Sequence, residues 1–389
     1  MGKRRSNGEG SIYKRSDGIW CAQATTGINP ATGRIKRKSF YGKTRKEAID
    51  KMNTLLAEIR IGNYVEPTKI TLGQWLDDWL QGRKPHISEN TYETLGTMIR
   101  CHLKPSLGAI KMKDLRTRDI QNLINDKFSF GRVDGKGGLS PRAVKYIHSV
   151  LNSALRQAIK ERLLVYNPAE AVELPRKRSR EMRTFSQEEL RRFLVQTRKH
   201  PQYTAFLLAI GTGLRRGELL GLRWIDIDLQ AGIMSIKQQL VRGRHALTFH
   251  EPKTQKSKRI IALHKELIDG LKTHKKQQNE HRLLIGSNYQ DYGLVFCRED
   301  GRPQDPCSFT RQFGAAVKEA GLERIRFHDL RHTFATLSLE AGVSIKAVQE
   351  VLGHTTISMT GDTYSHVTER MKVDAADRIG AVLEHCLSN

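Results

Sequence analysis

The spacing of hydrophobic side chains predicts a run of helices between residue 68 and about residue 175. Near the start of this stretch the apolar residues recur at intervals of three and four, as on one face of an amphipathic helix: Leu72, Trp75, Leu76, Trp79 and Leu80. A second helix should begin at Ser140-Pro141, an N-cap followed by a first-turn proline. Its inward stripe is Val144, Ile147, Leu151, Ala154, Leu155, Ala158 and Ile159. We expect this helical bundle to end near Asn167-Pro168.

The first 62 residues show a different pattern, typical of short strands closed by one helix. The segments IWCAQAT and RIKRKSF are separated by turn signals rich in Asp, Asn, Pro and Gly. The capping box from Thr44 to Glu47 predicts a helix whose buried face would carry Ile49, Met52, Leu56 and Ile59. This region predicts a three-stranded sheet with a helix packed on it.

The remainder of the chain mixes helices and strands. The exposed basic segment RKRSREMR, residues 176 to 183, reads as a linker, either a plain hinge or one that follows DNA. After it come a capped helix at Ser186, a buried helix YTAFLLAIGTG, and two or three strands that include GIMSIKQQLV and KRIIAL. Helices resume toward the end, and MKVDAADRIGAVLEHCL, residues 371 to 387, predicts a final one.

Charge narrows the class of partner. Lys and Arg number 66 against 41 acidic residues, a net charge of +25 that favours a polyanionic partner over a merely soluble basic protein. Up to residue 46 there are twelve basic residues and two acidic ones, so the N-terminal sheet is suited to a phosphate backbone, the alternative being a solvated face. No apolar run is long enough to span a membrane, and the five scattered cysteines give no disulfide framework or zinc spacing.

The first candidate for chemistry is GTGLRRGELLGLRW, residues 211 to 224. Gly211 and Gly213 allow a tight turn, after which Arg215 and Glu218 sit three apart on a helix. An arginine at a glycine-bordered helix start is well placed to meet a phosphate, and the glutamate can hold its side chain. Arg216 and Arg223 read as surface charges.

The second candidate is FHDLRHTFAT, residues 327 to 336. On a helix, His328, Arg331 and His332 would present one face. Two histidines at i and i+4 also match half of a metal site, but Asp329 and Leu330 stand where the metalloprotease motif needs its glutamate.

The third candidate is LGHTTISMTGDTYSHV, residues 352 to 367, which carries His354 and Tyr364. A phenol with a pKa of about 10 is a poor nucleophile at neutral pH unless a base or a strong positive field helps to remove its proton. Two arginines can supply that field and can also neutralise a phosphate in its transition state.

Together these motifs resemble the tyrosine recombinases, the lambda-type phage integrases. The resemblance covers most of the chain and is strongest between residues 184 and 370, where TGLRRGELLGLRW, PKTQKSKRIIAL, HDLRHTFAT and LGHTTISMTGDTY stand in the family's order. The layout before them is similar to that of integrases from conjugative transposons and Gram-positive phages. Met359 and Gly361 depart from the usual residues of the last motif, and Gly361 would make the segment that carries Tyr364 more flexible.

The resemblance implies a role for each matching residue. Tyr364 would attack the scissile phosphate and become joined to the 3′ end of the DNA, while Arg215 and Arg331 would bind the non-bridging oxygens. His354 would be a further phosphate donor, and His328 would assist proton transfer to or from the tyrosine. Lys253 would protonate the 5′-hydroxyl leaving group, although Lys256 or Lys258 on the same turn could take that part. Glu218 corresponds to a structural acid.

It also implies a multidomain fold, mainly α with small β-sheets. The expected parts are an arm-type DNA-binding domain at residues 1 to 62, a helical core-binding domain at 68 to 175, and a mixed α/β catalytic domain at 184 to 389. Because the phosphotyrosine link stores the energy of the broken bond, no ATP, metal or other cofactor is expected, in keeping with a sequence that has no Walker loop.

The implied partners are double-stranded DNA at core and arm attachment sites and three further copies of the chain, monomeric when free. An excisionase and a DNA-bending protein would assist, and the enzyme would work in the bacterial cytoplasm on the nucleoid. The final helix could pack on its own domain or dock on a neighbouring protomer. The function expected is integration and excision of a mobile element. The alternatives are a chromosome-dimer resolvase, a non-catalytic DNA-binding regulator on the same fold, and a metal-dependent nuclease using His328 and His332.

Overall fold

The computed structural model describes residues 10–28, 32–61, 64, 69–176, 183–243, 246–252 and 258–353. The chain divides into two compact units, residues 1–178 and 179–389, with a boundary inside the predicted basic linker. Lys253, His354, Tyr364 and the predicted final helix lie outside the described residues. None of the helices in these ranges is long and apolar enough to cross a membrane.

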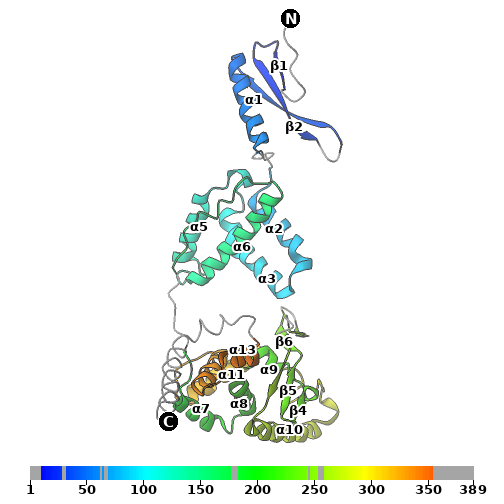
Figure 1. The fold of residues 1–389 in the computed structure, drawn as a ribbon, viewed down its shortest axis with the longest axis vertical. Coiled ribbons are helices and arrows are strands. Elements are labelled where there is room, and N and C mark those ends of the chain that lie inside the picture. The colour runs from blue at the N-terminus through cyan, green and yellow to red at the C-terminus, as the bar shows by residue number, and fades with distance from the viewer. Residues whose placement is uncertain are drawn as a thin grey trace, which may run out of the picture. The chain divides into compact units, whose positions relative to one another are not determined.

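The first unit begins with a three-stranded antiparallel sheet in the order β1-β2-β3, covered by one helix (Figure 1). The elements are β1 (Ser11–Lys14), β2 (Trp20–Ile28), β3 (Ile35–Gly42) and α1 (Arg45–Arg60). Alternation along β2 turns the small side chains of Ala22 and Ala24 toward α1, where Met52 fills the space above them. Thr44 caps α1 as predicted, by accepting from the Glu47 amide. The buried face of α1 is rotated from the predicted one: Ala48 and Leu55 are buried, while Ile49 is not part of the cluster.

The rest of the first unit is helical, as predicted, and has an apolar core of its own. Its helices are α2 (Leu72–Arg83), α3 (Glu89–Met98), α4 (Lys104–Leu107), α5 (Thr117–Phe130) and α6 (Pro141–Lys160), with a π-helical segment, Ile99–Leu103, between α3 and α4. The predicted N-cap Ser140 accepts from the Ala143 amide. Trp75 joins α2 to α6 by donating its indole N–H to the Ala154 carbonyl at 3.0 Å. The predicted division of this unit into arm-type and core-binding domains stays a prediction.

The second unit packs helices against two small antiparallel sheets, ordered β4-β5-β8 and β6-β7. Figure 1 shows the strands to one side of α8 and α11, with α10 along the base. The strands are β4 (Ile227–Asp228), β5 (Ile233–Ile236), β6 (Gln239–Arg242), β7 (Leu247–His250) and β8 (Arg259–Ala262). The helices are α7 (Gln187–Thr197), α8 (Tyr203–Thr212), α9 (Arg216–Leu220), α10 (Lys265–Ile285), α11 (Pro306–Glu319), α12 (Asp329–Glu340) and α13 (Ile345–Leu352).

One stretch of the second unit departs from the sequence pattern. GIMSIKQQLV was predicted as a single strand, but the chain leaves the first sheet after Ile236 and enters the second at Gln239. Between the two, the side-chain amide of Gln238 donates to the Gly221 carbonyl at 2.8 Å and ties the crossing point to the end of α9. The prediction of two or three strands was therefore too low, since five strands are described between residues 227 and 262.

Gly213 ends α8 with a left-handed backbone, φ +63°, and admits no side chain. A Cβ there would lie 2.6 Å from a methyl carbon of Leu352 and 2.8 Å from the ring of Phe334. This close approach lets the chain turn directly from α8 into the segment that carries Arg215.

Gly213→Ala should therefore destabilise the second unit more than Gly342→Ala does. Gly342 is the matched control because its φ of +83° is also left-handed but no atom lies within 4 Å of its would-be Cβ. Both variants carry a conformational cost of about 1–2 kcal/mol, and only Gly213→Ala adds an overpacking cost of about 1–3 kcal/mol. Thermal unfolding of the full chain measures the difference, and equal melting temperatures for the two variants would contradict it.

Candidate active site

Arg215 is the N-cap of α9, where the chain emerges from the turn at Gly213. Its amide donates to Glu218 Oε2 at 3.0 Å and its Nη1 donates to Glu218 Oε1 at 2.8 Å. Glu218 is buried, while the Arg215 side chain keeps about a third of its surface exposed. The three-residue spacing seen in the sequence thus becomes a closed loop of contacts that holds the arginine at the start of the helix.

Glu218 also binds a second arginine that the sequence analysis had not singled out. Arg259, at the start of β8, donates Nη2 to Glu218 Oε2 at 2.9 Å and Nη1 to Glu218 Oε1 at 3.2 Å. Burial by itself would raise the pKa of Glu218, but the hydrogen bonds and charge of Arg259, with the charge of Arg215, outweigh burial and hold that pKa below its usual range. The carboxylate is therefore ionised at neutral pH and shared between two guanidinium groups.

Arg331 reaches the same region from α12 and is almost fully buried. Its Nη1 donates to the Gly213 carbonyl at 2.8 Å and its Nη2 donates to the Leu352 carbonyl at 2.5 Å. These contacts link the end of α8 to the end of α13. The base of α12 is held by Asp329, which accepts hydrogen bonds from the Arg326 amide and guanidinium.

Three arginines meet three successive carbonyls at the C-terminal end of α13. Arg259 Nε donates to Val351 at 2.5 Å, Arg331 Nη2 to Leu352, and Arg215 Nη2 to Gly353 at 3.3 Å. The last carbonyls of a helix have no partner within the helix and lie at the negative end of its dipole, so cations stabilise them. Arg215 and Arg331 are 116 positions apart in the sequence (331 minus 215). Their side chains thus converge at the end of α13, directly before residue 354.

His328 and His332 lie next to this cluster. His328 is the N-cap of α12 and not part of the helix body, yet its ring packs edge-on against that of His332 with 5.3 Å between the ring centres. Burial, followed by the charge of Arg331, lowers the pKa of His328. Burial and the His328 ring lower the pKa of His332 to about 4. Both imidazoles are therefore neutral at pH 7 and can accept a proton.

The structure brings together Arg215, His328 and Arg331 of the six predicted site residues, while Lys253, His354 and Tyr364 lie outside the described ranges. Of the two other lysines considered for the role of Lys253, Lys258 is described, and its ammonium pairs with Glu251 at 2.8 Å. The residue that sequence reasoning missed is Arg259. Strand alternation could have found it, because Arg259 shares the inward face of β8 with the buried Ile261.

The two arginines read as surface charges have partners in the second unit. Arg216 remains exposed, but its Nη1 donates to the Thr310 hydroxyl at 2.7 Å and to the Pro306 carbonyl at 3.2 Å. Arg223 is half-buried and pairs with the buried Asp226 at 2.7 Å. Arg223 was therefore misread as a simple surface charge, because its partner lies on the 3-10 turn that follows it.

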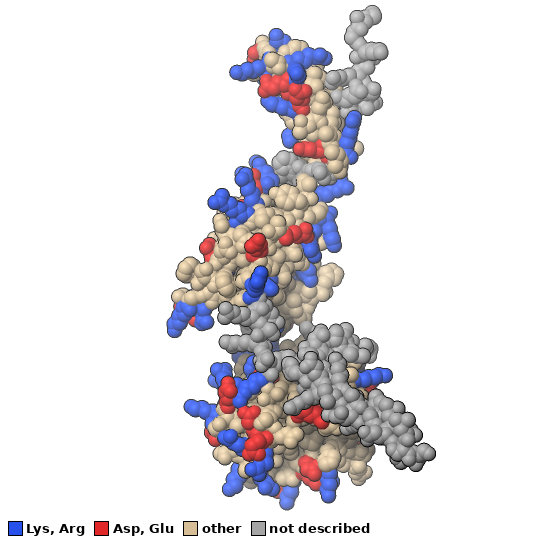
Figure 2. Space-filling model, turned by 60° about the vertical axis from the view of Figure 1, so that its left-hand side comes forward, with Lys and Arg blue, Asp and Glu red and all other residues tan. Residues whose placement is uncertain are grey.

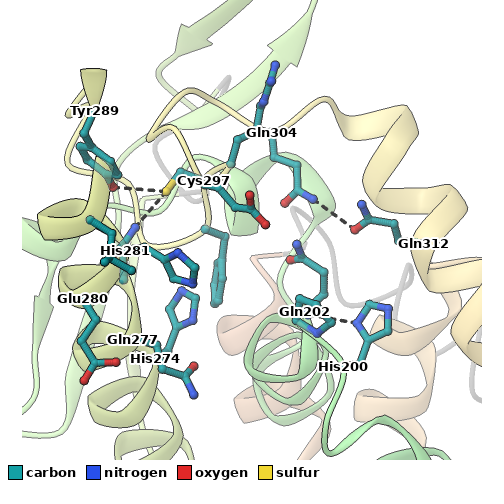
Figure 3. A pocket seen from close by; sticks show the side chains of 16 residues that line it. His200, Gln202, His274, Gln277, Glu280, His281, Tyr289, Cys297, Gln304 and Gln312 are labelled. Carbon is teal, nitrogen blue, oxygen red and sulfur yellow. Dashed lines mark hydrogen bonds between the residues drawn. The ribbon is translucent and has the colours of Figure 1, made fainter. Parts of the chain in front are cut away.

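A cavity of about 720 Å³ lies elsewhere in the second unit and uses none of the predicted site residues. Figure 3 shows its wall of α10 side chains, among them His274 and His281, facing Gln202, Gln304 and Gln312. Cys297 at its edge accepts from the Gln278 amide. Within the described ranges, neither this cavity nor the His328 and His332 pair contributes to a group of three side chains arranged to hold a metal ion.

Family models match both units of the chain. The model for the phage integrase family matches residues 180–371, and the model for the N-terminal SAM-like domain of phage integrases matches residues 71–128. The SAM-like match falls within the helical part of the first unit.

Several curated proteins are similar over nearly the whole chain. A XerC-like tyrosine recombinase of Caldanaerobacter subterraneus subsp. tengcongensis is 33% identical, over 89% of this chain and 92% of that protein. An integrase of Streptomyces ambofaciens is 28% identical, over 98% and 97%. The ICEBs1 integrase of Bacillus subtilis is 26% identical, over 96% and 100%.

Solved structures share the fold. The Tn1549 transposon integrase in complex with transposon right end DNA superposes with a TM-score of 0.69 at 22% identity, covering 80% of this chain and all of that one. A lambda integrase tetramer bound to a Holliday junction gives 0.56 at 23%, covering 92% and 96%. The family match and the similarity to a tyrosine recombinase define the class as a tyrosine-type DNA strand-exchange enzyme.

The chain belongs to the phage integrase family of tyrosine recombinases. It is a tyrosine-type site-specific DNA recombinase of the kind that mobile genetic elements encode. The predicted family, fold class and enzyme class are thereby confirmed.

The lowered pKa of His332 predicts a pH dependence of stability. Because the folded pKa of about 4 lies below the unfolded value near 6.5, the partly buried neutral ring contributes stability above pH 6.5 that is lost as the pH falls toward 4. The loss should be smaller than the roughly 3 kcal/mol that a fully buried ring would give, because solvent screens the partly exposed side chain. His332→Gln should flatten the pH profile of the melting temperature in this window, with exposed His86→Gln as control. An unchanged profile in His332→Gln would show that other groups set it.

Proposed function

We propose that this recombinase integrates and excises a mobile element by cutting and rejoining DNA through a covalent link between Tyr364 and a 3′-phosphate. The observation that carries the proposal is the convergence of Arg215 and Arg331 at the end of α13, from which the chain leads to His354 and Tyr364. Two guanidinium groups held this close supply the positive field that a phenol needs to act as a nucleophile on a phosphodiester.

The proposed steps balance as a transesterification. The Tyr364 oxygen forms a bond to phosphorus while the bond to the 5′-oxygen breaks, and Lys253 donates the proton that the 5′-oxygen takes up. His328 accepts the phenol proton, and it can do so because burial and the charge of Arg331 lower its pKa and keep the ring neutral at pH 7. Arg215 and Arg331 bind the non-bridging oxygens, and His354 donates a further hydrogen bond.

We infer that the remaining parts of the chain position this centre on DNA. Figure 2 shows more basic than acidic side chains on the visible face of the first unit, which suits contact with phosphates. In this scheme residues 1–62 bind arm sites, residues 68–175 bind the core site, and residues 184–389 carry out catalysis. Four copies assemble on two DNA sites in the bacterial cytoplasm, assisted by an excisionase and a DNA-bending protein.

The first test is covalent capture on a nicked core-site duplex, from which the short 5′-hydroxyl fragment diffuses away after cleavage. In EDTA the wild-type protein should give a protein-DNA band on a denaturing gel, and Tyr364→Phe should give none. Arg331→Met should lower the rate of band formation by about 100-fold or more, as loss of oxyanion stabilisation does elsewhere. Cleavage that requires a divalent ion would favour the nuclease reading, and binding without cleavage would favour the regulator.

The second test separates arm from core recognition. Because the β-sheet and the helical bundle have separate apolar cores, deletion of residues 1–62 should leave the remainder folded. The deletion should weaken binding to distal arm repeats by about 10-fold or more while core-site cleavage stays within about threefold of wild type, since the lost contacts are to phosphates of the arm DNA. Equal losses at both sites, measured by gel shift and by covalent capture, would contradict the division of labour.

A chromosome-dimer resolvase is the second candidate, because the 33% identical relative is named as XerC-like. The same deletion discriminates between the two. A resolvase should recombine its core site fully without residues 1–62, whereas an integrase should lose recombination between arm-containing attachment sites.

A further inference from the structure

We propose that Arg259 is a positioning residue for DNA cleavage. It neutralises the Glu218 carboxylate from the β8 side and holds the end of α13, so that the Arg215 guanidinium can bind the phosphate. This inference rests on the proposed role of Arg215. It assigns a role to Arg259 of β8, which lies within the motif PKTQKSKRIIAL but was given no role in the sequence analysis.

The described contacts of Arg259 direct its guanidinium at the protein. Its side chain is only 6% exposed, and three of its nitrogen atoms are directed at protein oxygens, two on Glu218 and one at Val351. Arg215 differs in that 35% of its side chain is exposed. The same carboxylate is thus bound by one buried arginine and by one that still reaches solvent.

The charge balance makes these two arginines interdependent. Glu218 carries one negative charge in a buried position, and a buried carboxylate needs a cation close by. With Arg259 present, the guanidinium on β8 supplies that cation. Arg215 then donates two side-chain hydrogen bonds to the protein, one to Glu218 and one to the Gly353 carbonyl. Without Arg259, Arg215 would be the one guanidinium left on Glu218 within the described part of the chain, and it would be drawn toward the carboxylate and away from a phosphate.

The anchor on Val351 adds a geometric constraint. The Val351 carbonyl lies one residue before the carbonyl bound by Arg331 and two before the one bound by Arg215. Arg259 therefore connects β8 to the same helix end that Arg215 and Arg331 bind. Loss of this tie would let the end of α13 shift relative to both, and a shift of about 1 Å can reduce a reaction rate by about 100-fold.

A matched control is available in the same unit. Asp226 is also a buried carboxylate bound by two cations, Arg223 at 2.7 Å and Lys237 at 3.1 Å, but none of its ion pairs within the described ranges is with a proposed site residue. Arg223→Met removes one of two cations from a buried acid, as Arg259→Met does, and so reproduces a merely structural loss.

The experiment measures DNA affinity and single-turnover covalent capture at saturating duplex for the full-length chain, with thermal unfolding to fix the folded fraction. Arg259→Met should bind DNA within about threefold of wild type and form the covalent product about 100-fold more slowly. Arg223→Met should form it within about threefold. The double variant Arg259→Met with Glu218→Gln should recover about tenfold over Arg259→Met, because no buried negative charge remains to draw Arg215 away from the phosphate.

Arg259→Lys keeps a charge beside Glu218 but cannot reach both Glu218 oxygens and the Val351 carbonyl. We therefore expect an intermediate loss, of about tenfold, in the rate of covalent product formation. This variant tests the proposal if Arg259→Met does not fold. The proposal is overturned if Arg259→Met or Arg259→Lys cleaves like Arg223→Met, or if removal of the Glu218 charge gives no recovery. Failure of the wild-type chain to form covalent product would instead overturn the proposed function, and this inference with it.

Discussion

The buried carboxylate of Glu218 is the constraint on which the second unit depends. Glu218 lies on α9. Its carboxylate accepts hydrogen bonds from Arg215 at the start of the same helix and from Arg259 on β8. A buried acid of this kind is tolerable only when its cations are held in place, and it in turn fixes where those cations can be. Glu218 therefore sets the distance between the start of its own helix and a strand whose first residue, Arg259, lies 41 positions after Glu218 in the sequence.

The second consequence of this arrangement is that the end of α13 becomes an assembly point. Its last carbonyls, at Val351, Leu352 and Gly353, are each bound by an arginine from a different element, β8, α12 and the start of α9. The helix dipole favours cations there. The backbone carbonyls orient the guanidinium groups without adding the negative charge that a carboxylate would bring. The arginines can thus be brought close together without an acid for each of them, which leaves the cluster with an excess of positive charge suited to a phosphate.

Local patterns were sufficient for part of this site. Arg215 and Glu218 contact each other because they stand three apart at a helix start, and the spacing of His328 and His332 brings their rings together. Alternation along β8 indicates that Arg259 faces inward, but it does not indicate what Arg259 contacts, because its partners come from α9 and α13. The break of one predicted strand at Lys237 and Gln238 was missed for the same reason, since the Gly221 carbonyl that holds it belongs to a distant segment. Periodicity predicted the helices and strands, and the family resemblance implied the fold class, whereas neither predicts the tertiary hydrogen bonds.

A guanidinium carries five N–H donors, and this number explains how one arginine can be both a structural and a chemical group. Arg215 gives one side-chain hydrogen bond to Glu218 and one to the Gly353 carbonyl within the described part of the chain, and its side chain still reaches solvent. A phosphate entering from the solvent side would meet a group whose rotamer is already fixed from the protein side. Most of the entropy cost of ordering a long side chain is then met on folding and not on DNA binding, which is the sense in which the site is preorganised.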